Sequence, residues 1–112
     1  MISRIELIPT TPLSHPFVRA ALSCGFEQKG YVEEEYFLHG TSNIYEETAQ
    51  GDVRVLFADA PYINRMVVRR PAEPDLFSGN VVLEVLNPSA RVDIDRIWVE
   101  TWPHLMRRGD IY

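Results

Sequence analysis

The stretch NVVLEVLNPSARVD, residues 80–93, decides the fold class of this 112-residue chain. Its first half is a run of aliphatic residues, three of them valine, and turn-forming residues flank the run on both sides. A strand that is covered on both faces has this composition, and parallel strands in α/β proteins are covered in this way. The pattern therefore predicts a buried strand at 81–86 and a loop that begins at Asn87.

The residues after this loop predict an amphipathic helix. Apolar side chains recur at intervals of three and four residues over 94–105, which is the helical period. Asp93 is predicted to be the N-cap, with Asp95 in the first turn, where the helix dipole favours negative charge. Pro103 lies inside the pattern, so the helix is expected either to kink there or to restart with Pro103 in a new first turn.

The predicted helix ends in a clear stop signal. Arg107 and Arg108 fall in its last turn, and Gly109 is placed to be the residue that ends it. The final residues, 110–112, have the composition of a strand that is beginning. The chain therefore stops where a strand–helix–strand unit would be completed.

The region before residue 80 predicts mostly antiparallel strands. A helix is also predicted at 15–24, between Ser14 and Gly25. The overall prediction is an α/β fold in a single domain, 1–112, with N-terminal antiparallel strands followed by one buried strand–loop–helix unit. The strands are expected at 2–8, 31–38, 43–47, 53–58 and 64–70, separated by glycine and proline.

Composition argues against several classes of function. The chain has 16 acidic and 11 basic residues and a net charge of -5, which does not suit a nucleic-acid partner. Its single cysteine allows no internal disulfide, and its three histidines have no zinc-ligand spacing. Its apolar N-terminus is too short for a membrane span. We expect a cytoplasmic protein without a metal, a cofactor or a membrane partner.

Charged residues within the predicted strands have competing interpretations. Glu84 lies in the apolar run, where a carboxylate is costly unless it is paired with an arginine or with backbone donors. A structural role for Glu84 is favoured, with a direct catalytic role as the alternative, and unrelated chemistry by Glu84 or His39 stays open. For the run 33–35, a solvated or arginine-paired strand is favoured over a general-acid pair. The pairs Arg69-Arg70 and Arg107-Arg108 are interpreted as solvated strand or helix ends, with a binding patch as the alternative.

The loop Asn87-Pro88-Ser89 has the best argument for function. In open α/β sheets, ligands bind beyond the carboxyl ends of the parallel strands, close to helix N-termini. Backbone N–H groups in such a loop can donate to an oxyanion. The alternative is a connecting loop without a chemical role. The sequence contains no Gly-x-Ser-x-Gly nucleophile elbow, no Walker A loop and no Gly-rich dinucleotide motif.

Several blocks of sequence agree, in order, with one known family. GYVEEEYFLHGTSNIY, PYINRMVVRRP, FSGNVVLEVLN and the Trp-bearing helix before Gly109 together resemble the N-terminal part of an alpha/beta-hydrolase superfamily branch labelled alpha/beta hydrolase domain. The resemblance covers roughly residues 25–112. It implies a cofactor-free, esterase-like hydrolase with a serine, an acid and a histidine. It also implies that 81–86 is the third core strand, and that the loop from Asn87 donates to the oxyanion.

The chain departs from the family pattern, because the nucleophile, the acid and the histidine of that pattern lie further along. None can be assigned to a residue here. The family sheet begins in the order 1-2-4-3, which implies an incomplete sheet with open edges at 65–70 and 81–86. We therefore expect an N-terminal fragment, inactive alone, whose partner is the remainder of a hydrolase chain or a second copy. The alternative is a small non-enzymatic binding or oligomerisation module that uses these strand edges.

Overall fold

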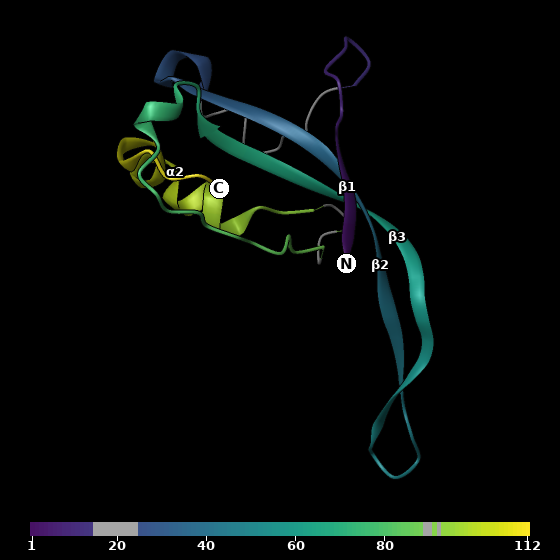
Figure 1. The fold of residues 1–112 in the computed structure, drawn as a ribbon. Coiled ribbons are helices and arrows are strands. Elements are labelled where there is room, and N and C mark those ends of the chain that lie inside the picture. Colours follow the sequence, from purple (N-terminus) through teal and green to yellow (C-terminus); the bar gives the residue numbers. More distant parts are fainter. Residues whose placement is uncertain (15–24, 89–90, 92) are drawn as a thin grey trace. The chain divides into compact units, whose positions relative to one another are not determined.

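The computed structural model describes residues 1–14, 25–88, 91 and 93–112 (Figure 1). The helix predicted at 15–24 lies outside the described residues. Within them, no helix has the length and apolar character that crossing a membrane requires. The described elements are β1 (Ile2–Leu7), the 3-10 helix η1 (Glu27–Lys29), β2 (Tyr31–Glu47), β3 (Val53–Pro71), the 3-10 helix η2 (Pro74–Leu76) and α2 (Arg96–Arg108).

The three strands form one sheet in the order β1-β2-β3, and the predicted antiparallel arrangement is confirmed. β1 runs antiparallel to β2, with Ile5 opposite Leu38. The strands predicted at 31–38 and 43–47 are one continuous strand, and those at 53–58 and 64–70 are another. Pro61 does not interrupt β3, because an edge strand tolerates a residue without an N–H donor.

The chain divides into two compact units, and β2 and β3 each contribute residues to both. Unit 1 contains Met1–Ile8 and Tyr36–Met66, and unit 2 contains Pro9–Glu35 and Val67–Tyr112. Gly40 is the one buried residue of unit 1, so this unit has no buried apolar side chain. The hydrophobic core, described next, belongs to unit 2.

The core of unit 2 forms around α2. Trp98 is completely buried, and the core also contains Tyr31, Leu105 and Tyr112. The predicted amphipathic helix is therefore confirmed. It is a single helix that continues through Pro103, and Gly109 ends it with a φ of 79°.

The segment 81–86 differs from its prediction. It is not a regular strand, and its one bridge joins Val81 to Ile111 in parallel. Val81, Leu83 and Val85 are 66%, 85% and 92% exposed, whereas the residues between them are half-buried. Val82 packs against the core. The prediction of a strand covered on both faces is wrong for this segment, because only its even-numbered side chains face the rest of unit 2.

The last three residues lie between this segment and β3. Ile111 donates its N–H to the Asn80 carbonyl at 3.0 Å and accepts from the Val82 N–H at 2.7 Å. Tyr112 and Arg69 exchange two backbone hydrogen bonds of 2.7 and 2.9 Å. The predicted strand beginning at 110–112 is therefore confirmed as strand-like pairing, and it closes the expected open edge at Arg69.

Gly109 gives a direct test of how tightly the end of α2 packs. A Cβ at Gly109 would lie 2.0 Å from the Leu76 carbonyl oxygen, whereas a Cβ at Gly30 would meet nothing within 4 Å, although φ is positive at both. Gly30→Ala should cost about 1–2 kcal/mol from the left-handed backbone alone. Gly109→Ala should add roughly 1–3 kcal/mol of overpacking to this cost. Urea unfolding followed by tryptophan fluorescence measures both, and equal costs would contradict the packing.

Candidate functional site

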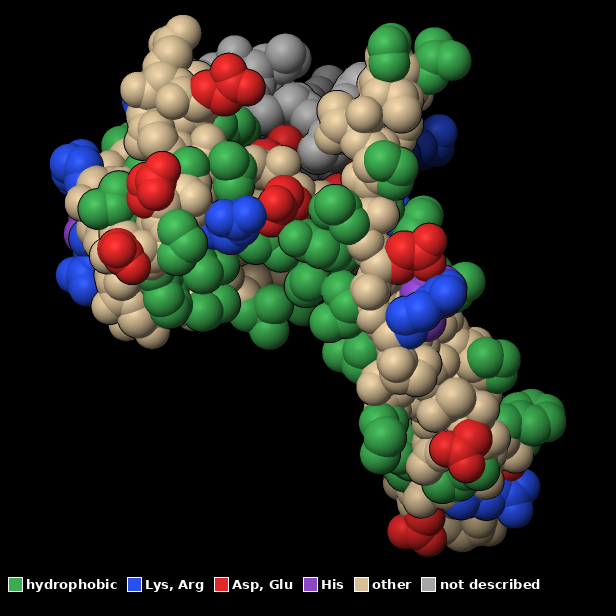
Figure 2. Space-filling view, turned by 45° about the horizontal axis from the view of Figure 1, so that its top comes forward, with side chains coloured by type: hydrophobic (Ala, Val, Ile, Leu, Met, Phe, Trp, Pro, Cys, Tyr) green, Lys and Arg blue, Asp and Glu red, His purple; other side chains and the backbone are tan. Residues whose placement is uncertain are grey.

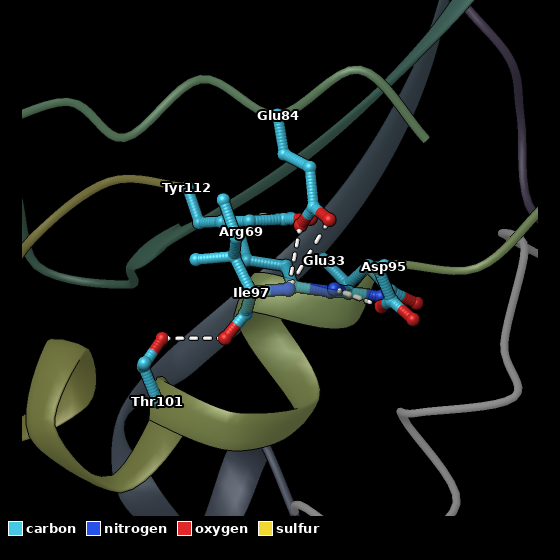
Figure 3. Close-up of polar contacts among 7 residues, drawn as sticks. All are labelled: Glu33, Arg69, Glu84, Asp95, Ile97, Thr101 and Tyr112. Carbon is cyan, nitrogen blue, oxygen red and sulfur yellow. Dashed lines mark hydrogen bonds and ion pairs between the residues drawn. The ribbon is translucent and has the colours of Figure 1, made fainter. Parts of the chain in front are cut away.

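Arg69 of β3 is the centre of a buried polar site in unit 2. Its side chain is 1% exposed. Its Nε donates to the Glu33 carboxylate of β2 at 2.6 Å, and its Nη1 donates to the Asp95 carboxylate at 2.5 Å (Figure 3). We call Arg69, Glu33 and Asp95 the Arg69 cluster. A buried guanidinium requires such partners, because an unpaired charge in this environment would be strongly destabilising.

Aromatic rings surround the guanidinium of Arg69. Its central carbon lies 4.7 Å from the ring centre of Trp98, 5.4 Å from that of Tyr112 and 5.7 Å from that of Phe26. Phe26 is stacked on Trp98, with 5.7 Å between the ring centres. Desolvated cation–π contacts of this kind are favourable by about 2 kcal/mol. The rings therefore stabilise the charge that the two carboxylates also neutralise.

The Arg69 cluster contains two carboxylates for one guanidinium. Burial raises the pKa of Glu33 above its ordinary value, although the hydrogen bond and positive charge of Arg69 act in the opposite direction. The Glu33 side chain is 8% exposed. Glu33 is thus held beside a cation without reaching open solvent, which suits a positioning role better than proton exchange with a substrate.

Glu84 binds the first turn of α2 from outside the helix. Both of its carboxylate oxygens lie 3.1 Å from the backbone N of Ile97, and the Tyr112 hydroxyl donates to the same carboxylate (Figure 3). The partners are a backbone donor and a tyrosine, not an arginine. A negative charge at a helix N-terminus is favourable, because the first N–H groups have no partner within the helix.

The beginning of α2 corrects the predicted cap. The helix starts at Arg96, so the N-cap is Asp95, not Asp93. The side chain of Asp95 makes no capping hydrogen bond, because it is bound to Arg69. Glu84 accordingly supplies the acceptor that an N-cap side chain ordinarily provides.

Tyr112 connects Glu84 to the core. Its ring lies 5.1 Å from that of Trp98, centre to centre. Burial raises the pKa of the Tyr112 phenol well above its ordinary value, and the hydrogen bond to the Glu84 carboxylate raises it further. The phenol is therefore a stable hydrogen-bond donor at neutral pH.

The loop predicted to carry an oxyanion donor is described in part. The N–H of Asn87 donates to the Ile94 carbonyl at 3.0 Å, and the Ile94 N–H donates back at 3.1 Å. Pro88 has no N–H, and its carbonyl accepts from the Arg91 N–H at 2.9 Å. Ser89 lies outside the described residues. Of the two described candidates, Asn87 and Pro88, neither offers an uncommitted backbone donor.

The remaining sequence candidates are not members of the Arg69 cluster. His39 belongs to unit 1, where its Nε2 is 3.3 Å from the Glu6 carboxylate and 3.0 Å from an Arg4 nitrogen. His104 is exposed on α2. His15 and Cys24 lie outside the described residues. Among the residues that the structure describes, no three metal-ligating side chains gather.

The sequence interpretation missed the role of Arg69. The sequence predicts a solvated strand end at Arg69-Arg70, but Arg69 is buried and only Arg70 is half-exposed. Arg70 binds Glu34 and Arg69 binds Glu33, so adjacent arginines pair with adjacent glutamates on the neighbouring strand. Two acidic residues and two arginines in consecutive positions of neighbouring strands could have indicated this pairing.

Comparison with known protein families gives a match. A family model described as alpha/beta hydrolase domain matches residues 4–112, which is nearly the whole chain. No curated protein and no solved structure matches the chain.

Replacing Arg69 should destabilise the protein severely. Arg69→Met removes the cation and leaves two buried carboxylates, with an expected cost of about 3–5 kcal/mol. Arg70→Met, one residue further along and partly solvated, should cost about 1 kcal/mol or less. Chemical unfolding measures both. If the unpaired charges are the cause, adding Glu33→Gln and Asp95→Asn to Arg69→Met should recover part of the loss, and no recovery would contradict this explanation.

Tyr112 should make the protein sensitive to alkali. Because its pKa is raised in the folded state, its contribution to stability is complete below the ordinary value of 10.0 and is lost as the pH rises above it. The free energy of unfolding should therefore fall above about pH 10, and it should fall less steeply in Tyr112→Phe. Identical slopes in the two proteins, measured by urea unfolding at a series of pH values, would rule out this role.

Proposed function

This chain belongs to the alpha/beta hydrolase domain family, and we propose that it forms the N-terminal part of a domain that hydrolyses ester-type bonds. The family match over residues 4–112 carries the proposal. The nucleophile, the acid and the histidine would come from residues beyond these 112, because the sequence contains no Gly-x-Ser-x-Gly elbow. By itself the 112-residue chain would be inactive.

The pairing of the last residues supports this proposal. Ile111 pairs in parallel with Val81, and Tyr112 pairs with Arg69 on the other side. The family order 1-2-4-3 requires a fourth strand between the second and the third. The residues 110–112 would be the first part of that strand, with β3 as the second strand and 81–86 as the third.

The oxyanion donor in this proposal is the N–H of Ser89. The Asn87 N–H already donates to Ile94, and Pro88 has no N–H to offer. Ser89 is the remaining residue of the three that the family resemblance implicates. A backbone N–H directed at the carbonyl oxygen of an ester stabilises the negative charge that develops there during acyl transfer.

The Arg69 cluster would position this loop without touching the substrate. Asp95 fixes the start of α2 to Arg69, and Glu84 fixes 81–86 to the same helix turn. The loop that contains Ser89 connects these two fixed points. A backbone donor that the fold positions in advance would require no reorganisation during the reaction, which is the basis of electrostatic catalysis.

The oxyanion role can be tested in the protein extended through the coding sequence that follows Tyr112. Ser89→Pro removes the backbone N–H and should lower kcat by roughly 100- to 1,000-fold. Ser89→Ala keeps the N–H and should stay close to the parent. Hydrolysis of p-nitrophenyl acetate gives kcat, and labelling by a fluorophosphonate reports the nucleophilic serine.

Three results would contradict these proposals. If Ser89→Pro and Ser89→Ala have the same kcat, Ser89 is not a backbone donor to the oxyanion. If the purified 112-residue chain hydrolyses the ester and a serine-directed inhibitor blocks this hydrolysis, the chain contains its own catalytic serine. The proposal that the triad lies beyond these 112 residues would then be wrong. Coding sequence without an elbow after Tyr112 would remove the hydrolase proposal altogether.

A second candidate function is self-association through unit 1. Val53, Val55 and Phe57 alternate along β3 and are 69%, 46% and 60% exposed, so they form one exposed apolar face. The ion pair between Arg54 and Glu46 sets a register that adds Tyr45 to this face. Figure 2 shows apolar side chains on the surface of unit 1. Glu47 lies at one end of the face.

A second copy suits this face because a twofold interface would place the two Glu47 carboxylates at opposite ends. Phe57→Glu should convert a dimer into a monomer, whereas Leu56→Glu, on the opposite face of β3, should not. Light scattering at about 100 µM protein reports the mass, since association depends on concentration. A parent protein that is monomeric at this concentration would dismiss the second candidate.

A further inference from the structure

A small pocket in unit 2 combines positive charge with an apolar wall. It has a volume of about 240 Å³ and lies beside the C-terminal end of α2. Its basic residues are Lys29, from η1, with Arg107 and Arg108, from α2. Its apolar wall includes Tyr31, Leu76 and Met106. All of the residues that line it are described and belong to unit 2.

The concentration of positive charge here is unusual for this chain. The net charge is -5, and Lys29 is the one lysine in the sequence. Arg108 is 3.4 Å from the Asp110 carboxylate, which offsets its charge. No described residue forms an ion pair with Arg107. Arg107 therefore brings to the pocket a positive charge that no ion pair among the described residues offsets.

Capping of α2 does not account for these cations. Basic side chains often bind the last carbonyl groups of a helix. Here the Leu105 carbonyl already accepts from the Tyr31 hydroxyl at 3.2 Å and from the Asp110 N–H at 3.0 Å. The Met106 carbonyl accepts from the Gly109 N–H at 3.3 Å. The backbone and a buried tyrosine therefore cap this helix end.

Lys29 is held at the pocket by a second contact. Its ammonium lies 4.7 Å from the ring centre of Trp102, within the range of a cation–π interaction. This contact comes from a different element than the arginines, so the pocket presents positive charge from two sides. An anion placed between them would be bound by charge-assisted hydrogen bonds.

We propose that this pocket binds a small organic anion with a carboxylate or phosphate head group and a short apolar body. Lys29 and Arg107 bind the head group, and Leu76 and Met106 contact the body. The volume of about 240 Å³ lies below the roughly 300–1,000 Å³ of drug-sized sites, so a small ligand fits it best. The inference does not rest on the hydrolase proposal, because the pocket contains none of the residues used there.

Amide NMR of the 112-residue chain tests the proposal with benzoate and phenyl phosphate as probes. Saturable shifts of the Gly30 and Gly109 amide signals are expected with at least one of them, and the preferred probe identifies the head group. Benzamide, which has the same ring as benzoate but no charge, should bind at least about tenfold more weakly than benzoate.

Variants on the same elements give the control. Lys29→Gln and Arg107→Gln should each weaken binding by about tenfold, because each removes a charged hydrogen-bond donor. Arg107→Lys should restore part of the affinity. Arg96→Gln, on the same helix but paired with Glu100, should have no effect. The proposal is overturned if neither anion gives a saturable shift, if benzamide binds equally well, or if Lys29→Gln and Arg107→Gln bind like the parent.

Discussion

The burial of the Arg69 guanidinium is the constraint on which the rest of unit 2 depends. A charge that is 1% exposed must be neutralised within the fold, so Glu33 and Asp95 both have to lie beside Arg69. Glu33 belongs to β2 and Asp95 begins α2, so this one side chain on β3 joins the sheet to the helix. Its backbone also exchanges two hydrogen bonds with Tyr112, which fixes the final residues of the chain beside it.

The two units differ in what stabilises them. Unit 2 has a core of aromatic and aliphatic side chains around Trp98, and the burial of apolar surface is the dominant favourable term in folding. Unit 1 depends on backbone hydrogen bonds and on exposed ion pairs such as Arg54–Glu46. Such pairs contribute at most about 1 kcal/mol each. The exposed apolar side chains of unit 1 are therefore the surface through which we expect it to contact a second copy.

Glu84 does for α2 what the N-cap residue Asp95 ordinarily would: it accepts a backbone hydrogen bond from the first turn. Asp95 occupies the N-cap position, but its carboxylate is needed by Arg69. Glu84 reaches the vacant backbone donor at Ile97 from another segment, and the Tyr112 hydroxyl orients it. The result fixes both ends of the loop that contains Ser89, which is the part of this alpha/beta hydrolase domain with a proposed chemical role.

The sequence by itself determined the elements whose signal is local. The three- and four-residue period and Gly109 identified α2, alternation identified the strands, and ordered blocks of sequence identified the family. Tertiary structure decided the rest, because the partners are distant in sequence: Arg69 is 36 residues from Glu33 and 26 from Asp95. The apolar run at 81–86 was predicted to be covered on both faces. An apolar composition shows only that either face of a strand could be buried without cost, not that both faces are buried. Which face is buried depends on the segments that pack against it, and here these are α2 and the last residues of the chain.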